Sequence, residues 1–195
     1  MSSHADSGME EPPCPRISEG HNITDTTPAV FLDVHGVISY KGKPTVFLDV
    51  DGVVNDLNQG HDMILSHGYT LSIPRWMPEL IQGLVEIADV WWLSTWRERA
   101  NDEIAKHLGI ESLQVITDGT RDRYVGWKST AAAPLAKQLL DEGREVYWIE
   151  DFGNFGGPPI DLMPSGVVYV DTAAEHGKSV LVAEDLPTKL IRKRS

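Results

Sequence analysis

Two aspartates at the end of an apolar segment are the residues best suited to chemistry in this chain. Residues 46–52 read VFLDVDG, which places Asp49 and Asp51 two positions apart and directly before Gly52. A carboxylate at the end of a buried strand can attack phosphorus and form an aspartyl-phosphate. A second carboxylate beside it can protonate the leaving oxygen and then activate water. Gly52 allows the backbone to turn close to a ligand. Together with the two carboxylates, it makes the segment a predicted phosphoryl-transfer site.

The same segment carries a family resemblance. An apolar strand followed by DxDG is the opening motif of the haloacid dehalogenase (HAD) superfamily, and VFLDVDG resembles it at every position. The resemblance implies that Asp49 is the nucleophile and Asp51 the general acid/base of a phosphatase. It also implies that Mg²⁺ binds the Asp49 carboxylate and the main-chain carbonyl of Asp51.

Two further motifs of this family have counterparts. An apolar strand ending in a hydroxyl residue is matched by WWLSTW, with Ser94 the better fit and Thr95 its neighbour. A hydroxyl there would bind the transferring phosphoryl group, although a helix N-cap is the alternative role. Lys128 in GWKST matches the family's lysine and would offset the charge of Asp49 and phosphate. A solvated surface lysine is the commoner reading of any lysine, and Lys137 fits the motif less well.

The fourth motif is an acidic pair after an apolar strand, and VYWIED supplies Glu150 and Asp151. Carboxylate oxygens at a strand end suit Mg²⁺, which keeps several waters and takes few protein carboxylates. Many relatives have two aspartates here, so Glu150 departs from the pattern. Either Glu150 reaches the metal through water, or Asp151 is the closer ligand. The four motifs follow the family order across residues 45–152.

A narrower resemblance concerns the HAD domain of Swiss Army Knife RNA repair proteins. WLSTWRERAN is similar to that group's W-x-T-x-W-x-x-x-A-N segment, and YWIED to its W-I-D-D segment. This resemblance implies a role on nucleic-acid phosphate ends. Arg97 and Arg99 follow the second motif and are candidates to contact the substrate, although surface arginines at a helix start are the commoner case. The tryptophans would stack a base or, more commonly, pack in the core.

Alternating apolar segments predict the elements that position these residues. Strands that are apolar throughout favour a parallel sheet covered by helices on both faces, which is a Rossmann-like α/β fold. In such sheets the ligand lies at the carboxyl ends of the strands, where the residues above are found. Strands are expected at 46–50, 90–94, 112–117, 146–150 and 166–171, and helices at 78–88, 99–109 and 131–142.

A repeat precedes the catalytic segment. VFLDV occurs at 30–34 and again at 46–50, but His35 stands in the first copy where Asp51 stands in the second. We therefore assign the catalytic strand to the second copy. The expected organisation is a disordered acidic tail (1–28), a degenerate repeat forming an accessory strand or arm (29–44) and a HAD-like catalytic domain (45–195).

The spacing of the motifs leaves little room for a cap domain. Only 42 residues separate Asp51 from Ser94, and much of that is one helix and one strand. A separate domain of ordinary size does not fit there. An open, capless site is therefore expected. It would admit a large phosphorylated substrate, such as a phosphoprotein or a polynucleotide end, or leave closure to another subunit.

Composition narrows the class of protein. A net charge of −12 over 195 residues disfavours non-specific binding to nucleic acid or to an anionic membrane. Cys14 is the single cysteine, so no intramolecular disulfide forms. No targeting segment or membrane-spanning run is visible, which favours a cytoplasmic protein.

The expected function is Mg²⁺-dependent hydrolysis of a phosphomonoester through an aspartyl-phosphate. One alternative is a nucleic-acid end-processing phosphatase or binding module. A second is an inactive scaffold that retained the HAD fold. The presence of Asp49, Asp51, Ser94 and Lys128 together counts against that second alternative.

Overall fold

The computed structural model describes residues 31–32, 38–39, 42–56, 58, 61, 63–66, 68–119, 126–155, 157–173 and 180–191. The expected tail at 1–28 lies outside these residues, as do Asp33 and His35 of the first VFLDV copy. Strands β1 (Phe31–Leu32) and β2 (Ile38–Ser39) pair with each other in an antiparallel two-stranded sheet. The roles expected for the tail and the first copy stay predictions.

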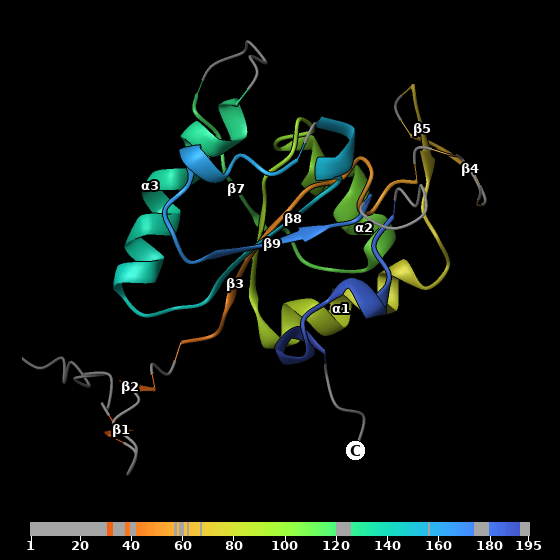
Figure 1. Cartoon of the computed structure of the whole chain (residues 1–195). Helices are drawn as coiled ribbons and strands as arrows, with labels where there is room; N and C mark the ends of the chain where they lie inside the picture. The colour runs from red at the N-terminus through yellow and green to blue at the C-terminus, as the bar shows by residue number, and fades with distance from the viewer. Residues whose placement is uncertain are drawn as a thin grey trace, which may run out of the picture.

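A five-stranded sheet forms the centre of the protein (Figure 1). Its order is β7-β6-β3-β8-β9, and every pairing between neighbouring strands is parallel. This confirms the expected α/β class with a mainly parallel sheet. The strands are β3 (Thr45–Leu48), β6 (Asp89–Trp92), β7 (Gln114–Val115), β8 (Val146–Glu150) and β9 (Val167–Asp171).

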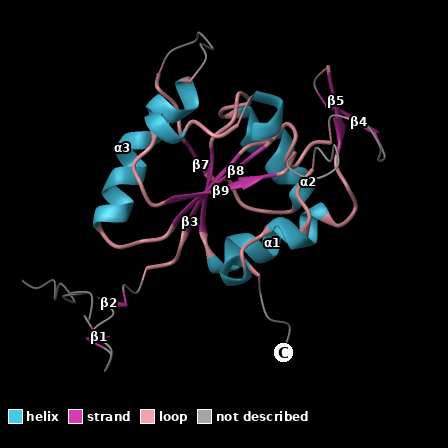
Figure 2. Ribbon diagram, viewed as in Figure 1, coloured by secondary structure: helices cyan, strands magenta, loops and turns pink. Residues whose placement is uncertain are grey.

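Helices cover both faces of this sheet. Side chains of a strand alternate between the two faces, and the strands are apolar on both, so each face has apolar side chains to bury. On β3, Val46 and Leu48 belong to one apolar cluster, which includes residues of α1 (Met77–Ile87) and α2 (Lys106–Leu108). Phe47 belongs to a second cluster, formed with α3 (Trp127–Asp141). Figure 2 shows α3 on one side of the strands and α1 with α2 on the other.

Two helices differ from the sequence-based expectation. The segment expected as one helix at 99–109 begins with π-helical turns at Ala100–Ala105 and continues as α2, ending at Gly109 with a left-handed φ of 66°. Helix α3 begins at Trp127 rather than at 131, directly after Gly126 with a φ of 86°. Lys128 therefore lies in the first turn of α3 instead of ahead of it.

Between β3 and α1 lies a small antiparallel hairpin of β4 (Met63–Ser66) and β5 (Tyr69–Ser72). It stands apart from the main sheet in Figure 1. On β4 the side chains of Met63 and Leu65 are exposed. The hairpin lies in the interval between Asp51 and Ser94, where the sequence left little room for a separate domain.

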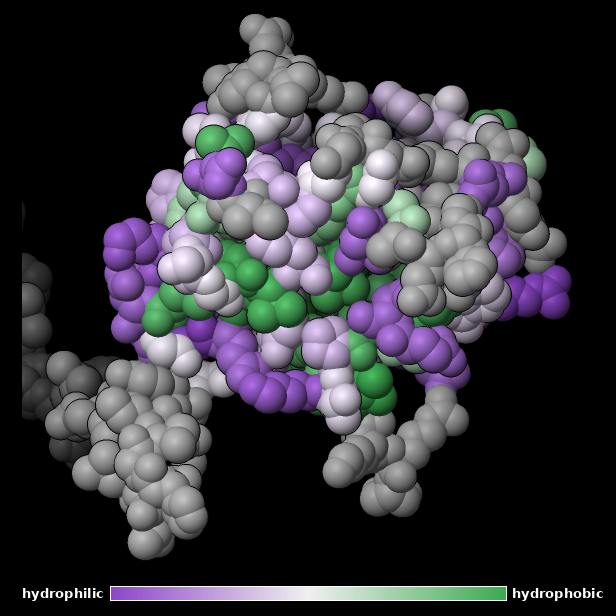
Figure 3. Space-filling view, in the orientation of Figure 1, coloured by the Kyte–Doolittle hydropathy of each residue, from purple (hydrophilic) through white to green (hydrophobic). Residues whose placement is uncertain are grey.

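Short 3₁₀ turns complete the described chain, at Phe152–Phe155, Ile160–Leu162, Ala183–Asp185 and Thr188–Leu190. Figure 3 shows apolar surface near the middle of one face with hydrophilic residues around it. No helix among the described residues has the length and apolar character needed to cross a bilayer.

Candidate functional site

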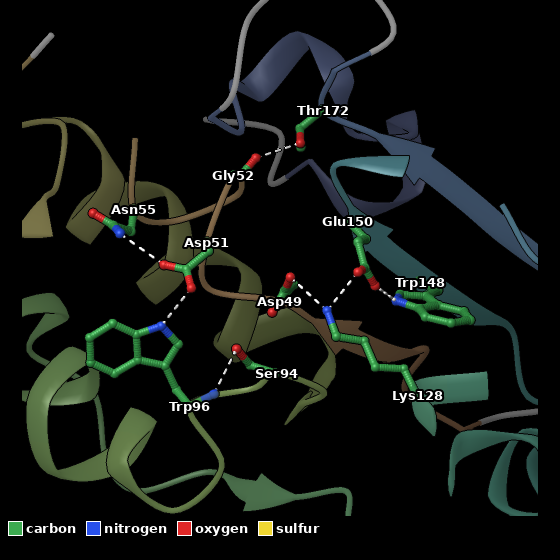
Figure 4. Close-up of polar contacts among 10 residues, drawn as sticks. All are labelled: Asp49, Asp51, Gly52, Asn55, Ser94, Trp96, Lys128, Trp148, Glu150 and Thr172. Carbon is green, nitrogen blue, oxygen red and sulfur yellow. Dashed lines mark hydrogen bonds and ion pairs between the residues drawn. The ribbon is translucent and has the colours of Figure 1, made fainter. Parts of the chain in front are cut away.

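The polar residues singled out in the sequence converge at one edge of the sheet. Strand β3 pairs with β6 on one side and β8 on the other, with Leu48 opposite both Trp92 and Ile149. Because the strands are parallel, the residues that follow them emerge together at the carboxyl edge. Figure 4 shows Asp49, Ser94 and Glu150 at this edge.

Lys128 links two of the carboxylates. Its Nζ donates to Asp49 Oδ2 at 2.7 Å and to Glu150 Oε1 at 2.6 Å (Figure 4). The second oxygen of Glu150 accepts a hydrogen bond from Trp148 Nε1 at 2.8 Å. Asp49 and Glu150 are both buried, so Lys128 offsets negative charge in a place that water reaches poorly. The expected lysine of the third motif therefore contacts the expected nucleophile.

The pKa values of this group reflect that environment. Burial and the charge of Asp49 raise the pKa of Glu150 to about 7, against the opposing effects of Lys128 and Trp148. Burial lowers the pKa of Lys128, but the charges of Asp49 and Glu150 and its hydrogen bonds to both outweigh burial, so that its pKa lies above the usual value. A divalent cation beside Glu150 would favour its ionised form and reverse the first of these shifts.

A cluster of three buried carboxylates can hold a metal ion. Asp49, Glu150 and Asp151 each offer one oxygen, and these oxygens lie within 4.8 Å of one another. Asp49 Oδ1 is buried and accepts no hydrogen bond from the described part of the chain. Gly52 has a φ of 75°, and a Cβ at this position would overlap the Asp151 carboxylate. An oxygen-only donor set with an orphaned carboxylate oxygen fits a hard divalent cation.

Asp51 is outside that cluster and has neutral neighbours. Its Oδ1 accepts a hydrogen bond from Asn55 Nδ2 at 2.9 Å, and its Oδ2 accepts one from Trp96 Nε1 at 2.9 Å (Figure 4). The residue is half-buried, whereas Asp49 is 4% exposed. The two aspartates of the DxDG segment are therefore held by different kinds of group.

The remaining expected residues occupy distinct places. Ser94 is buried, and its Oγ accepts a hydrogen bond from the backbone N–H of Trp96 at 3.3 Å. Thr95 is half-buried beside it. Arg97 has a positive φ of 53°, forms an ion pair with Asp118 at 3.7 Å and lies over the Trp127 ring at 5.4 Å. The structure thus joins Ser94 to the sheet edge, while Arg97 has partners of its own.

Several side chains at the site were not singled out from the sequence. Trp148 and Asn55 hold carboxylates, and Thr172 donates through Oγ1 to the main-chain oxygen of Gly52 at 2.6 Å. Trp96 and Trp148 had a signal, because they are tryptophans of the W-x-T-x-W and W-I-D-D patterns. Asn55 and Thr172 had none, since their contacts depend on how loops and strands distant in the sequence pack together.

Comparisons of the chain with protein-family models, with curated proteins and with solved structures find no match. The geometry of the site is therefore the basis on which a function can be assigned. That geometry combines a buried carboxylate paired with a lysine, a cluster able to hold a cation, and a separate carboxylate on neutral donors.

Proposed function

We propose that this chain is a metal-dependent phosphomonoester hydrolase of the HAD type, acting through an aspartyl-phosphate on Asp49. The observation that carries the proposal is the contrast between two nearby carboxylates. Asp49 is paired with Lys128 inside the metal-binding cluster, and Asp51 is held outside it by Asn55 and Trp96. A nucleophile must be ionised, and an acid/base must exchange a proton with the substrate, so the two roles need different surroundings.

Mg²⁺ is the cation we propose, because the donors are carboxylate oxygens. Asp49 and Asp151 would hold the ion, together with the main-chain carbonyl of Asp51. Glu150 already accepts hydrogen bonds on both oxygens, from Lys128 and Trp148, and would act on the ion through water. When bound, the ion offsets charge on the phosphoryl oxygens and orients the phosphate for in-line attack.

In the first step a carboxylate oxygen of Asp49 attacks phosphorus, and the bond from phosphorus to the ester oxygen breaks. Asp51, protonated, gives its proton to that leaving oxygen, which departs as an alcohol. The Lys128 ammonium stabilises the negative charge that spreads over the phosphoryl oxygens. The Ser94 Oγ accepts from a backbone N–H, so its own proton is directed elsewhere and donates to a phosphoryl oxygen.

In the second step water attacks the aspartyl-phosphate. Asp51, now ionised, takes a proton from this water as its oxygen bonds to phosphorus. The bond from phosphorus to the Asp49 oxygen breaks, which releases inorganic phosphate and restores both aspartates. The overall reaction is hydrolysis of a phosphomonoester to an alcohol and phosphate.

The direct test is phosphate release from para-nitrophenyl phosphate with Mg²⁺ and with a chelator. Metal-dependent release by the wild-type chain, absent from Asp49→Asn, is the expected result. A wider panel of small phosphorylated metabolites and an end-phosphorylated oligonucleotide then identifies the preferred class of substrate. No release from any member of the panel would reject the proposal in favour of an inactive scaffold.

A further inference from the structure

The β4–β5 hairpin contacts the surroundings of Asp51 by two separate routes. We propose that this hairpin holds the Asp51 carboxylate in position through Asn55 and Trp96, which act as positioning residues for proton transfer to the leaving group. The inference depends on the proposed function, since it concerns the same acid/base. It adds an element, and two side chains, that neither the DxDG segment nor its resemblance assigns.

The first route passes through Asn55, which is buried. Its Oδ1 accepts a hydrogen bond from the backbone N–H of Ser72 on β5, at 2.8 Å. A backbone N–H can only donate, so this contact fixes the carboxamide with its Nδ2 group facing Asp51. The Nδ2 group then donates to Asp51 Oδ1 at 2.9 Å. A second backbone bond, from Asp56 to the Ser72 carbonyl at 2.8 Å, ties the same loop to β5.

The second route passes through Trp96, whose indole N–H donates to Asp51 Oδ2 at 2.9 Å. The indole packs against the Tyr69 ring of β5, with ring centroids 5.0 Å apart. The Arg99 guanidinium lies 4.8 Å from the Tyr69 centroid and 5.9 Å from that of Trp96, and it donates to the Tyr69 hydroxyl. The hairpin and the segment after β6 therefore fix the plane of the indole together.

Each Asp51 oxygen consequently has one neutral donor whose direction the hairpin sets. Both donors keep the carboxyl plane fixed, and neither adds charge beside it. Proton transfer to a leaving oxygen needs the carboxyl group within hydrogen-bond reach and correctly aimed, so loss of one donor reduces transfer more than binding. The loss should be larger when the leaving group depends more on protonation.

The dependence of the loss on the leaving group distinguishes a role in proton transfer from a purely structural role. The aryl leaving group of para-nitrophenyl phosphate departs with little help from an acid, whereas the alkoxide of glycerol phosphate must be protonated. The parameter to measure is kcat/KM, because it reports the phosphorylation step, in which Asp51 acts as an acid. Trp96→Phe keeps the ring and removes the donor.

We expect Trp96→Phe to lower kcat/KM for glycerol phosphate by about 10-fold more than for para-nitrophenyl phosphate, as part of the 10²–10⁴-fold that general acid catalysis supplies. The matched control is Trp76→Phe, which removes an N–H that donates to the Leu181 carbonyl and should leave both substrates unchanged. Tyr69→Ala, at a side chain 41% exposed, should reproduce the selective loss from the hairpin side. The exposed Leu65→Ala on β4 should not.

Equal losses on both substrates in Trp96→Phe and Tyr69→Ala would reduce the hairpin to a structural support and overturn the inference. Unchanged kinetics in both variants would overturn it as well. In either case the wild-type chain still hydrolyses both esters, so the proposed function stands. Absence of metal-dependent hydrolysis by the wild-type chain would instead reject the proposed function, and the inference with it.

Discussion

Asp49 and Asp51 are two residues apart, yet they lie in two different regions of the molecule. Asp49 is surrounded by charge, with Lys128 at 2.7 Å and the carboxylates of Glu150 and Asp151 in the same cluster. Asp51 is surrounded by neutral donors, the amide of Asn55 and the indole of Trp96. In a continued strand, residues two apart would share one face, but β3 ends at Leu48 and the chain turns at Val50, so the two side chains enter separate environments.

The two regions also differ in what builds them. The charged region comes from the ends of the parallel strands β3 and β8 and from the first turn of α3. The neutral region comes from the loop after β3, the segment after β6 and the β4–β5 hairpin. In our proposal the sheet itself holds Asp49 as nucleophile, whereas the β4–β5 hairpin holds Asp51 as acid/base.

The largest effect should come from replacing Asp49, the proposed nucleophile. Asp49→Asn should reduce phosphate release below detection, because an amide cannot form the aspartyl-phosphate. Asp33→Asn changes the same residue of the first VFLDV copy and should leave activity at the wild-type level. Equal damage from both substitutions in a phosphate-release assay would show that the second copy is not the sole catalytic strand.

Metal removal examines the charged region alone. Chelation with EDTA should abolish turnover, and Mg²⁺ should restore it. By linkage, Mg²⁺ at about 100 times its Kd should also add about 2.7 kcal/mol to the free energy of unfolding. Thermal unfolding measures this as a rise in Tm, which Asp151→Asn should remove. Full turnover in a chelated sample would contradict the charged region's assigned role.

Loss of the acid/base examines the neutral region. Asp51→Asn should lower kcat by about 10²–10⁴-fold, the usual contribution of general acid–base catalysis. The Mg²⁺-induced rise in Tm should persist in this variant, because its side chain is outside the metal-binding cluster. A kcat near the wild-type value would show that Asp51 is not the acid/base. Loss of the Mg²⁺-induced rise in Tm would show that the Asp51 side chain contributes to metal binding.

The smallest effect should come from the tryptophan that holds Glu150. Trp148→Phe removes the N–H donor to Glu150 and should raise the Mg²⁺ concentration at half-maximal activity by about 10-fold, as expected for groups that orient metal ligands. Trp92→Phe is the matched control, because its buried N–H donates to Asn101 instead. A shift of the same size in both variants would attribute the effect to lost packing.

Much of this fold follows from the amino-acid sequence. Apolar runs such as VFLDV and VYWIE have the length and character of buried parallel strands, and the polar residues after them must then meet at one edge. Gly109 ends its helix as expected, in the left-handed conformation. The start of α3 was misplaced because Trp127, Ser129 and Thr130 have modest helix propensity and no capping side chain marks the boundary.

The contacts within the site were harder to predict from the sequence than the fold. Lys128 could be matched to a motif, but its ion pairs with Asp49 and Glu150 depend on how α3 packs against the sheet. Asn55 looks like an ordinary loop residue until β5 is placed beside it. Our proposal that Glu150 acts through water rests on its hydrogen bonds from Lys128 and Trp148, which the sequence did not indicate.

The central position of β3 has a consequence for how the chain folds. Both of its neighbours, β6 and β8, come later in the sequence, so the strand that leads into Asp49 is completed by long-range pairing. Pairing of this kind makes folding slow. The VFLDV segment that begins within β3 also occurs at 30–34, which leaves the ribosome first. We therefore expect the earlier copy to compete with β3 for the central position of the sheet while the chain folds.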